Sequence, residues 1–394
     1  MIIGEPILRW ARWTLLPAAM LAASGVDAAD LKVGVSSSLS GPLSALGIPY
    51  EKGIRAAFAH QSNVAGRNVQ LIVLDDASDP TTAARNARKL IGEDKVDVLI
   101  GTSGVPGSLA MASVAREMQV PLISPTPFNL PSADSGWTVT VSQSFPVMVN
   151  AVVEHMKQSG VKSVAYIGYS DALGDLAYDS LVKSADAMGI KVVGNERYGR
   201  TDSSVTGQVI KIMAARPDAV FAGNSGSPGA LPYLALKERG YKGQLYGSHG
   251  LINVDFVRVA AAAADGLMVP SGPVMVADDL PPGHPAREPA QTFRSTYRRL
   301  HGSFPEDAFS AYTFDAWLLF AHAAGRVDAG IEPGTPQYRI ALRDAIVNTK
   351  GLAGANGSYN FRPGSAYGLE QPSVMVIRLD KGTWRLVPES IQGR

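Results

Sequence analysis

VDVLIGTSGVPGSLAMASVAREMQVPLISPTP, residues 96–127, combines two short apolar runs with a stretch of small residues and a helical pattern between them. The runs at 96–101 and 120–125 predict buried strands, and 108–118 predicts a helix. Buried apolar strands that alternate with helices are typical of a parallel sheet covered on both faces. The segment therefore predicts an α/β fold in which GTSGVPGS, 101–108, is a loop between a strand and a helix.

The same strand–loop–helix order recurs along the chain and predicts two α/β units of similar layout, the second starting near residue 146. A mostly helical stretch at 286–349 and short strands near the end follow the second unit. The other strands that we expect are 31–36, 68–76, 163–168, 190–198, 218–224, 358–361 and 373–379, and the other helices are 48–60, a segment from Pro80 to Leu90, 175–189, 205–217 and 230–240.

Composition indicates a folded protein of ordinary charge and more than one domain. The chain has 394 residues, of which 46% are hydrophobic and 18% charged, and this length predicts two domains. Its formal net charge is +1, and no run of Lys and Arg exceeds two residues, which argues against a nucleic-acid binder. There is no cysteine, so neither disulfides nor a cysteine-linked lipid anchor can form.

The amino-terminal residues have the pattern of a secretory leader. Arg9 and Arg12 precede an apolar stretch at 13–23, and Val-Asp-Ala at 26–28 fits a small-x-small cleavage motif. A membrane anchor is the alternative, but the apolar stretch is shorter than the roughly 20 residues that a span needs. We therefore expect residues 1–28 to be a cleaved signal peptide.

Loops rich in small residues follow the expected strands. In open parallel sheets, ligands bind beyond the carboxyl ends of the strands. Glycine lets the backbone approach a ligand closely, and a helix start offers free N–H groups that suit an anion. Each loop could also be an ordinary Gly/Pro/Ser turn, so only the set as a whole indicates a small-ligand site. The loops are 36–47, 101–108, 124–129, 168–175, 223–229 and 247–253.

Enzyme motifs are missing from these loops. GxxxxGK[ST], GxGxxG after the first strand, GxSxG and HExxH are all absent, and we expect no cofactor and no metal. Asp75 and Asp76 end a strand, where a capping role competes with paired-carboxylate chemistry. Serine hydrolysis would require the fold to bring Ser103 or Ser225 next to His249 without any recognisable motif, so we expect no catalysis.

Four features together carry a family resemblance. SGPLSALG (40–47), the helix near Pro49, VQLIVLDDASDPTTAARNARKLI (69–91) and the 96–127 segment resemble the periplasmic binding proteins of branched-chain amino-acid-type ABC importers. The resemblance covers about residues 30–385. It implies a type I periplasmic binding protein, with two doubly wound parallel-sheet lobes joined by a three-segment hinge.

The resemblance also implies a domain division and a role. Lobe one would comprise 30–143 and 273–353, and lobe two 144–272 and 354–394. The lobes would close around a small ligand, a known kind of hinge motion. We expect a periplasmic, non-lipidated monomer whose partners are a small-molecule carboxylate and an ABC permease in the inner membrane.

Candidate contacts in lobe one follow from position in the family. Ser103 and the backbone amides of Gly104 and Val105 correspond to the loop that holds a ligand carboxylate. The stretch Thr126, Pro127, Phe128 stands where members offer Ala-x-Thr to the ligand ammonium.

In lobe two, Leu173 and Ser225 stand at positions where members usually have tyrosines, and His249 where an acid usually pairs with the ammonium. A desolvated ammonium needs a negative or strongly accepting partner. We therefore expect a carboxylate with an apolar or aromatic body, held by the amides of 103–106 and by His249 if protonated. The full expected contact set is Leu46, Ser103, Gly104, Val105, Thr126, Pro127, Phe128, Tyr169, Leu173, Asn224, Ser225 and His249.

Three alternatives stay open at this point. The same fold could bind a branched-chain amino acid or an amide, if the positions are shifted. The chain could be the ligand-sensing partner of a signalling receptor. It could also be a secreted hydrolase on an α/β scaffold.

Overall fold

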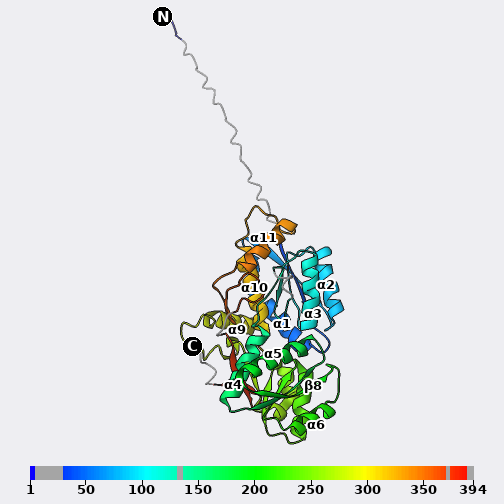
Figure 1. The fold of residues 1–394 in the computed structure, drawn as a ribbon. Helices are drawn as coiled ribbons and strands as arrows, with labels where there is room; N and C mark the ends of the chain where they lie inside the picture. Colours follow the sequence, from blue (N-terminus) through cyan, green and yellow to red (C-terminus); the bar gives the residue numbers. More distant parts are fainter. Residues whose placement is uncertain (5–29, 131–135, 370–372, 388–394) are drawn as a thin grey trace.

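The computed structural model describes residues 1–4, 30–130, 136–369 and 373–387 (Figure 1). The expected signal peptide, 1–28, lies outside the described residues except for its first four. Within the described part of the chain, no helix combines the length and the apolar character needed to cross a membrane.

The first sheet has six strands in the order β2-β3-β1-β4-β5-β6. β1 runs parallel to both β3 and β4, which lie on either side of it, so the strand order reverses at β1. In such sheets the crevice outside the carboxyl ends at the reversal is the usual ligand site. The strands are β1 (Leu31–Ser37), β2 (Asn63–Val64), β3 (Arg67–Asp75), β4 (Val98–Gly101), β5 (Leu122–Ser124) and β6 (Thr138–Thr140).

Helices cover both faces of this sheet, and together they form lobe one. Along β4 the side chains alternate: Leu99 packs in the core beneath α2 and α3, whereas Val98 and Ile100 pack toward α1 and α10. Figure 1 shows α2 and α3 on one side of the sheet and α10 on the other. The helices are α1 (Ser44–His60), α2 (Pro80–Gly92), α3 (Val105–Glu117), α9 (Arg287–His301), α10 (Ser310–Ala324) and α11 (Pro336–Val347).

Three helices begin at least three residues earlier than the sequence patterns predict, and one of them is α5 (Ala172–Met188), whose predicted start is 175. α1 starts at Ser44 instead of 48 and includes Pro49. α3 starts at Val105 instead of 108, and Pro106 occupies its second position. Proline is well placed in a first helical turn, because its missing N–H would have no partner inside the helix there.

The second sheet has seven strands in the order β15-β14-β11-β10-β9-β7-β8, and lobe two is built on it. β7 lies between β8 and β9 and is parallel to both, so this sheet also reverses its strand order. β14 and β15 are antiparallel additions at one edge. The strands are β7 (Ser163–Tyr169), β8 (Lys191–Tyr198), β9 (Ala219–Gly223), β10 (Gln244–Gly247), β11 (Met268–Ser271), β14 (Met375–Asp380) and β15 (Thr383–Leu386).

Lobe two carries helices on both sides of its sheet, and α4, α5 and α6 lie in the lower part of Figure 1. The sequence analysis made no specific prediction for α4, α8, β2, β6, β11, β12 (Leu352–Gly354) and β15. The helices are α4 (Phe145–Gln158), α5 (Ala172–Met188), α6 (Thr206–Ala215), α7 (Leu231–Glu238) and α8 (Val254–Ala260), with short 3-10 turns at Ser227–Ala230, His249–Leu251, Ala261–Ala264 and Pro273–Val276.

The third lobe boundary needs to be moved. The small hairpin β12 (Leu352–Gly354) and β13 (Gly357–Tyr359) packs against α10 of lobe one. The Tyr359 hydroxyl lies within hydrogen-bond distance of the Asp315 carboxylate of α10 (2.7 Å) and of the Val141 carbonyl (2.8 Å). We therefore propose that the last crossing to lobe two comes after Leu369, not at 353/354, whereas we keep the boundaries at 143/144 and 272/273 as proposed.

α1 and α10 approach each other closely at a glycine. The Thr313 hydroxyl on α10 donates to the Tyr50 carbonyl on α1 at 2.7 Å. A Cβ on Gly53 would lie 1.9 Å from the Ser310 carbonyl oxygen, so only glycine permits this packing. Since Tyr50 lies one turn before this contact, the crossing also positions part of the cleft between the lobes.

We predict that Gly53→Ala lowers the free energy of unfolding by about 2 kcal/mol or more, because α1 and α10 must separate to admit the methyl group. Gly92→Ala is the matched control: Gly92 also lies in a helix, and its nearest neighbour to an added Cβ is 4.0 Å away. Urea unfolding should show G92A unchanged or slightly more stable. Equal effects of the two substitutions would contradict the packing argument.

Candidate ligand-binding site

A cavity lies between the lobes, at the carboxyl ends of both sheets. Its volume is about 40 Å³, which is room for water. The lobes meet around it, since the His249 ring of lobe two lies 5.5 Å from the rings of Phe309 and Tyr312 in lobe one. A larger ligand must part the lobes to enter. The lining residues are Leu46, Tyr50, Ser103, Gly104, Val105, Pro125, Thr126, Pro127, Phe145, Leu173, Ser225, Ser248, His249, Gly250, Phe309 and Tyr312.

The structure brings together nine of the twelve residues expected from the sequence. Both lobes contribute to this group, as a ligand held by closure requires. The nine are Leu46, Ser103, Gly104, Val105, Thr126, Pro127, Leu173, Ser225 and His249.

The other three expected residues lie outside this cavity. Phe128 is fully buried in the hydrophobic core, and its carbonyl accepts from Tyr367. Tyr169 is also buried, and its hydroxyl donates to the Ser225 carbonyl at 2.6 Å. The Asn224 amide nitrogen donates to the Tyr198 hydroxyl at 2.9 Å. These three side chains make their contacts within the protein and do not line the cavity, so we no longer propose them as ligand contacts.

Free backbone donors lie at the start of α3. The N–H groups of Ser103, Gly104 and Val105 have no acceptor among the described residues. Pro106 has no N–H, so the expected cradle of 103–106 is reduced to three amides. The amino end of a helix carries partial positive charge, and these amides therefore suit an anionic oxygen.

The hydroxyls of lobe one are already engaged. Ser37 donates to the Gly47 carbonyl at 2.9 Å, so in its 3.1 Å contact with Ser103 the proton must come from Ser103. Thr126 likewise donates to the Thr102 carbonyl at 2.6 Å. The Ser103 hydroxyl therefore braces the loops, and its backbone N–H is the donor that remains for a ligand.

The two strand-end carboxylates are structural. Asp76 accepts hydrogen bonds from Ser38 Oγ at 2.6 Å, from Ser36 Oγ at 3.2 Å and from Thr102 Oγ1. Asp75 accepts from the backbone amides that follow β1 and β3. These hydrogen bonds hold the loops together. They favour the structural role of Asp75 and Asp76 over paired-carboxylate chemistry.

Lobe two offers a cation that the sequence argument missed. Arg200 donates through Nη1 to Ser225 Oγ at 3.1 Å and through Nε to Asp171 at 2.6 Å, and it stacks over the Tyr169 ring at 4.1 Å. Its Nη2 is buried and has no hydrogen-bond partner among the described residues. The Ser225 proton also has no acceptor there, so Ser225 and Arg200 are two donors on the lobe-two side.

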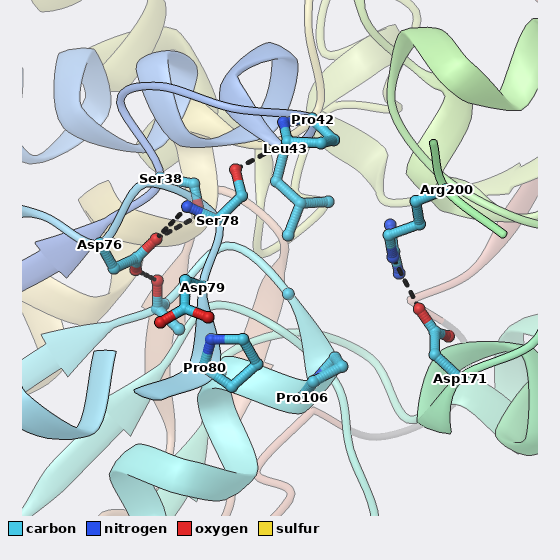
Figure 2. A pocket seen from close by; sticks show the side chains of 13 residues that line it. Ser38, Pro42, Leu43, Asp76, Ser78, Asp79, Pro80, Pro106, Asp171 and Arg200 are labelled. Atoms are coloured by element: carbon cyan, nitrogen blue, oxygen red, sulfur yellow. Dashed lines mark hydrogen bonds and ion pairs between the residues drawn. The ribbon is translucent and has the colours of Figure 1, made fainter. Parts of the chain in front are cut away.

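Arg200 lines a second cavity of about 180 Å³, which shares Gly104 with the first. Figure 2 shows Arg200 and Asp171 on one side of it and Leu43 and Pro106 on the other. Arg200 follows the carboxyl end of β8, and the loop after this strand is not among the six predicted site loops. Applying the same rule to residues 199–204 would have found it.

His249 is held in one tautomer. Its Nδ1 lies 3.0 Å from the Pro270 carbonyl, which can only accept, so Nδ1 carries the hydrogen. Nε2 is buried and has no partner among the described residues. Burial lowers the pKa of His249 to about 4, so the protonation on which its expected contact with a carboxylate depends is disfavoured in this structure.

Aromatic side chains form the remaining walls. Tyr50 lies one turn after Leu46 on α1, Phe145 begins α4, and Phe309 and Tyr312 lie at the start of α10. None of the described residues that line the cavity is Asp or Glu. In the described ranges, no group of three or more His, Asp or Glu could hold a metal ion.

Comparisons with known proteins agree with this architecture. Residues 30–383 match the family described as "Periplasmic binding protein". A Leu/Ile/Val-binding protein homolog of Brucella melitensis is 24% identical over 90% of this chain and 92% of its own length. An extracellular ligand-binding receptor from Rhodopseudomonas palustris HaA2 is 37% identical over 91% of this chain and all of its own, with a TM-score of 0.88. An R. palustris solute-binding protein solved with benzoate is 23% identical, covers 91% and 96%, and has a TM-score of 0.76.

We predict that His249 makes stability depend on pH. Its folded-state pKa of about 4 lies below the ordinary 6.5, so the unfolded chain binds the proton more tightly. The contribution is therefore present above pH 6.5 and is lost as pH falls toward 4. Between pH 7.5 and 5.0 the free energy of unfolding should fall by about 2 kcal/mol more in the wild type than in His249→Phe.

Urea unfolding at the two pH values measures this difference. His60→Phe is the control, because His60 is exposed at the end of α1 and should leave the pH dependence unchanged. The same pH dependence in H249F and the wild type would show that His249 is not buried as a neutral ring.

Proposed function

The chain belongs to the periplasmic binding protein family, and from this premise we propose that it captures a small aromatic carboxylate and delivers it to an ABC permease in the inner membrane. It is a solute-binding receptor of the Leu/Ile/Val-binding type, and its relatives are binding proteins of ABC transporters, not enzymes. The hydrolase alternative is therefore dropped. The ligand class, the permease and cleavage of a leader at residues 1–28 are our proposals.

One observation carries the choice of ligand: the cavity combines free donors with aromatic walls and lacks an acid. Three backbone amides of lobe one and the Ser225 hydroxyl of lobe two line this cavity, and Arg200, which donates to Ser225, lines the neighbouring cavity that shares Gly104. Donors of this kind suit a carboxylate. An ammonium would find no carboxylate among the described lining residues, and burying it uncompensated costs several kcal/mol. The rings of Tyr50, Phe309 and Tyr312 suit a flat apolar body.

Contacts from both lobes give the ligand a reason to stabilise the closed form. A ligand shifts a conformational equilibrium only by its different affinity for the two states. A carboxylate that touches amides of lobe one and Ser225 of lobe two gains the second set of contacts only on closure. We propose that the permease recognises this closed form.

A branched-chain amino acid is the second candidate. The names of the relatives include both Leu/Ile/Val binding and a benzoate complex, at 24% and 23% identity, and they do not choose between the two ligand classes. The acid-free cavity favours the aromatic carboxylate. The two classes can be separated directly by binding measurements.

Ligand-induced thermal shifts of the chain from residue 29 onward, confirmed by calorimetry, test the proposal. One panel holds benzoate, hydroxybenzoates, phenylacetate and 3-phenylpropanoate, and the other holds the common amino acids. A ligand at 100 times its Kd adds about 2.7 kcal/mol of stability. We expect shifts with aromatic acids alone. Shifts with leucine, isoleucine or valine alone would overturn the ligand class but leave the receptor role intact.

We predict that Arg200→Met weakens binding of the best carboxylate by about tenfold to a hundredfold, because a charge-assisted donor beside Ser225 is lost. Arg239→Met is the control: Arg239 lies at the end of α7, pairs with Glu238 on the surface and should leave Kd unchanged. Unfolding without ligand checks that R200M folds. Wild-type affinity in a folded R200M would remove Arg200 from the site.

A further inference from the structure

The Nε2 atom of His249, which lines the cavity, has no hydrogen-bond partner among the described residues. Among the described lining residues, it is the one buried side-chain atom without a hydrogen-bond partner. The residue is 6% exposed, so this nitrogen is shielded from bulk solvent, and a partner must enter the cavity to reach it. Buried polar groups in folded proteins are nearly always paired, and an unpaired one calls for a partner that arrives from elsewhere.

The orientation of the ring leaves only one kind of partner. Because Nδ1–H donates to the Pro270 carbonyl, Nε2 presents a lone pair and can only accept. Phe309 and Tyr312 contact the ring edge to face, with interplanar angles of 75° and 69°, and hold it in place. A carboxylate oxygen beside this lone pair would be repelled, so the ligand must bring a donor.

In this structure no described polar group of the cavity donates to Nε2. The Tyr312 hydroxyl donates to Gln143 at 2.5 Å, and the Thr126 hydroxyl donates to the Thr102 carbonyl. A ligand ammonium could donate, but it would be a buried charge with no carboxylate on the described cavity wall. A neutral O–H meets the need without that cost.

We propose that the ligand carries, in addition to its carboxylate, a neutral hydroxyl group that donates a hydrogen bond to His249 Nε2 in the closed form. This inference rests on the proposed function and narrows its ligand class to hydroxylated aromatic acids. The cavity would then bind the two groups in different ways: it donates hydrogen bonds to the carboxylate and accepts one from the hydroxyl. The carboxylate binds the free amides at the start of α3 and Ser225, with Arg200 behind Ser225 in the neighbouring cavity, whereas the hydroxyl binds the one unpaired side-chain acceptor among the described lining residues.

This arrangement predicts that a hydroxylated acid and its parent acid differ in affinity. A site built to bind a ligand hydroxyl rejects the analogue without it, since the buried acceptor is then left unpaired. The parent acid that lacks the hydroxyl should therefore bind at least about tenfold more weakly.

Calorimetric Kd values for matched acids test the proposal. The sets are benzoate with its 2-, 3- and 4-hydroxy derivatives and 4-methoxybenzoate, phenylacetate with mandelate, and 3-phenylpropanoate with its 4-hydroxy derivative. We expect at least one hydroxylated acid to bind about tenfold or more tightly than its parent, and 4-methoxybenzoate to gain nothing, because an ether cannot donate. Equal affinity within every set would overturn the inference.

Two variants connect the preference to His249. His249→Phe keeps a flat ring and removes the acceptor, so the hydroxyl preference should shrink to about twofold or less. His249→Gln keeps an accepting oxygen and should retain part of the preference. An undiminished preference in H249F would overturn the assignment to His249.

Proton uptake supplies an independent readout. Calorimetry at pH 7 in phosphate and in Tris, whose ionisation enthalpies differ, should give the same heat, since a neutral histidine accepts without taking up a proton. Uptake of about one proton per ligand would mean an imidazolium bound to the carboxylate and would overturn the inference. Failure of every carboxylate to bind would overturn the proposed function itself, so the two failures are distinguishable.

Discussion

The Asp76 carboxylate is the contact on which the lobe-one side of the cleft depends. It accepts hydrogen bonds from the hydroxyls of Ser36 near the end of β1, Ser38 just after β1 and Thr102 just after β4, and Asp76 itself directly follows β3. Three adjacent strands are thereby joined at their carboxyl ends, where the sheet reverses its order. Because Thr102 directly precedes Ser103, this contact also sets where the free amides of the α3 loop lie.

The two lobes contribute different chemistry to the ligand site. Lobe one offers main-chain N–H groups and aromatic walls, and its hydroxyls are used to brace its own loops. Lobe two offers the side chains of Ser225, Arg200 and His249. In the proposed site the donors and His249 Nε2, the one unpaired side-chain acceptor among the described lining residues, are unlike groups, so we expect a ligand with two different polar ends to bind in one orientation.

The sequence predicts the fold well because buried strands and strand-end glycines are local signals. The 96–127 segment folds as the pattern indicates, apart from the early start of α3 at Pro106. The site is predicted less well, since side-chain direction depends on partners distant in the chain. Phe128 enters the core, and the tautomer of His249 is set by Pro270, 21 residues away. Arg200 was missed because the loop after β8 was not considered.

The division between main-chain and side-chain contacts affects how the protein can change. No substitution short of proline removes the N–H groups of Gly104 and Val105, so the part of the proposed carboxylate binding that they supply does not depend on side-chain identity. The proposed polar contacts of lobe two, Ser225, Arg200 and His249, are side chains, and each can be lost by a single substitution. We therefore expect ligand specificity to change, in nature or in a designed biosensor, mainly through substitutions in lobe two. The backbone amides of lobe one would continue to bind the carboxylate.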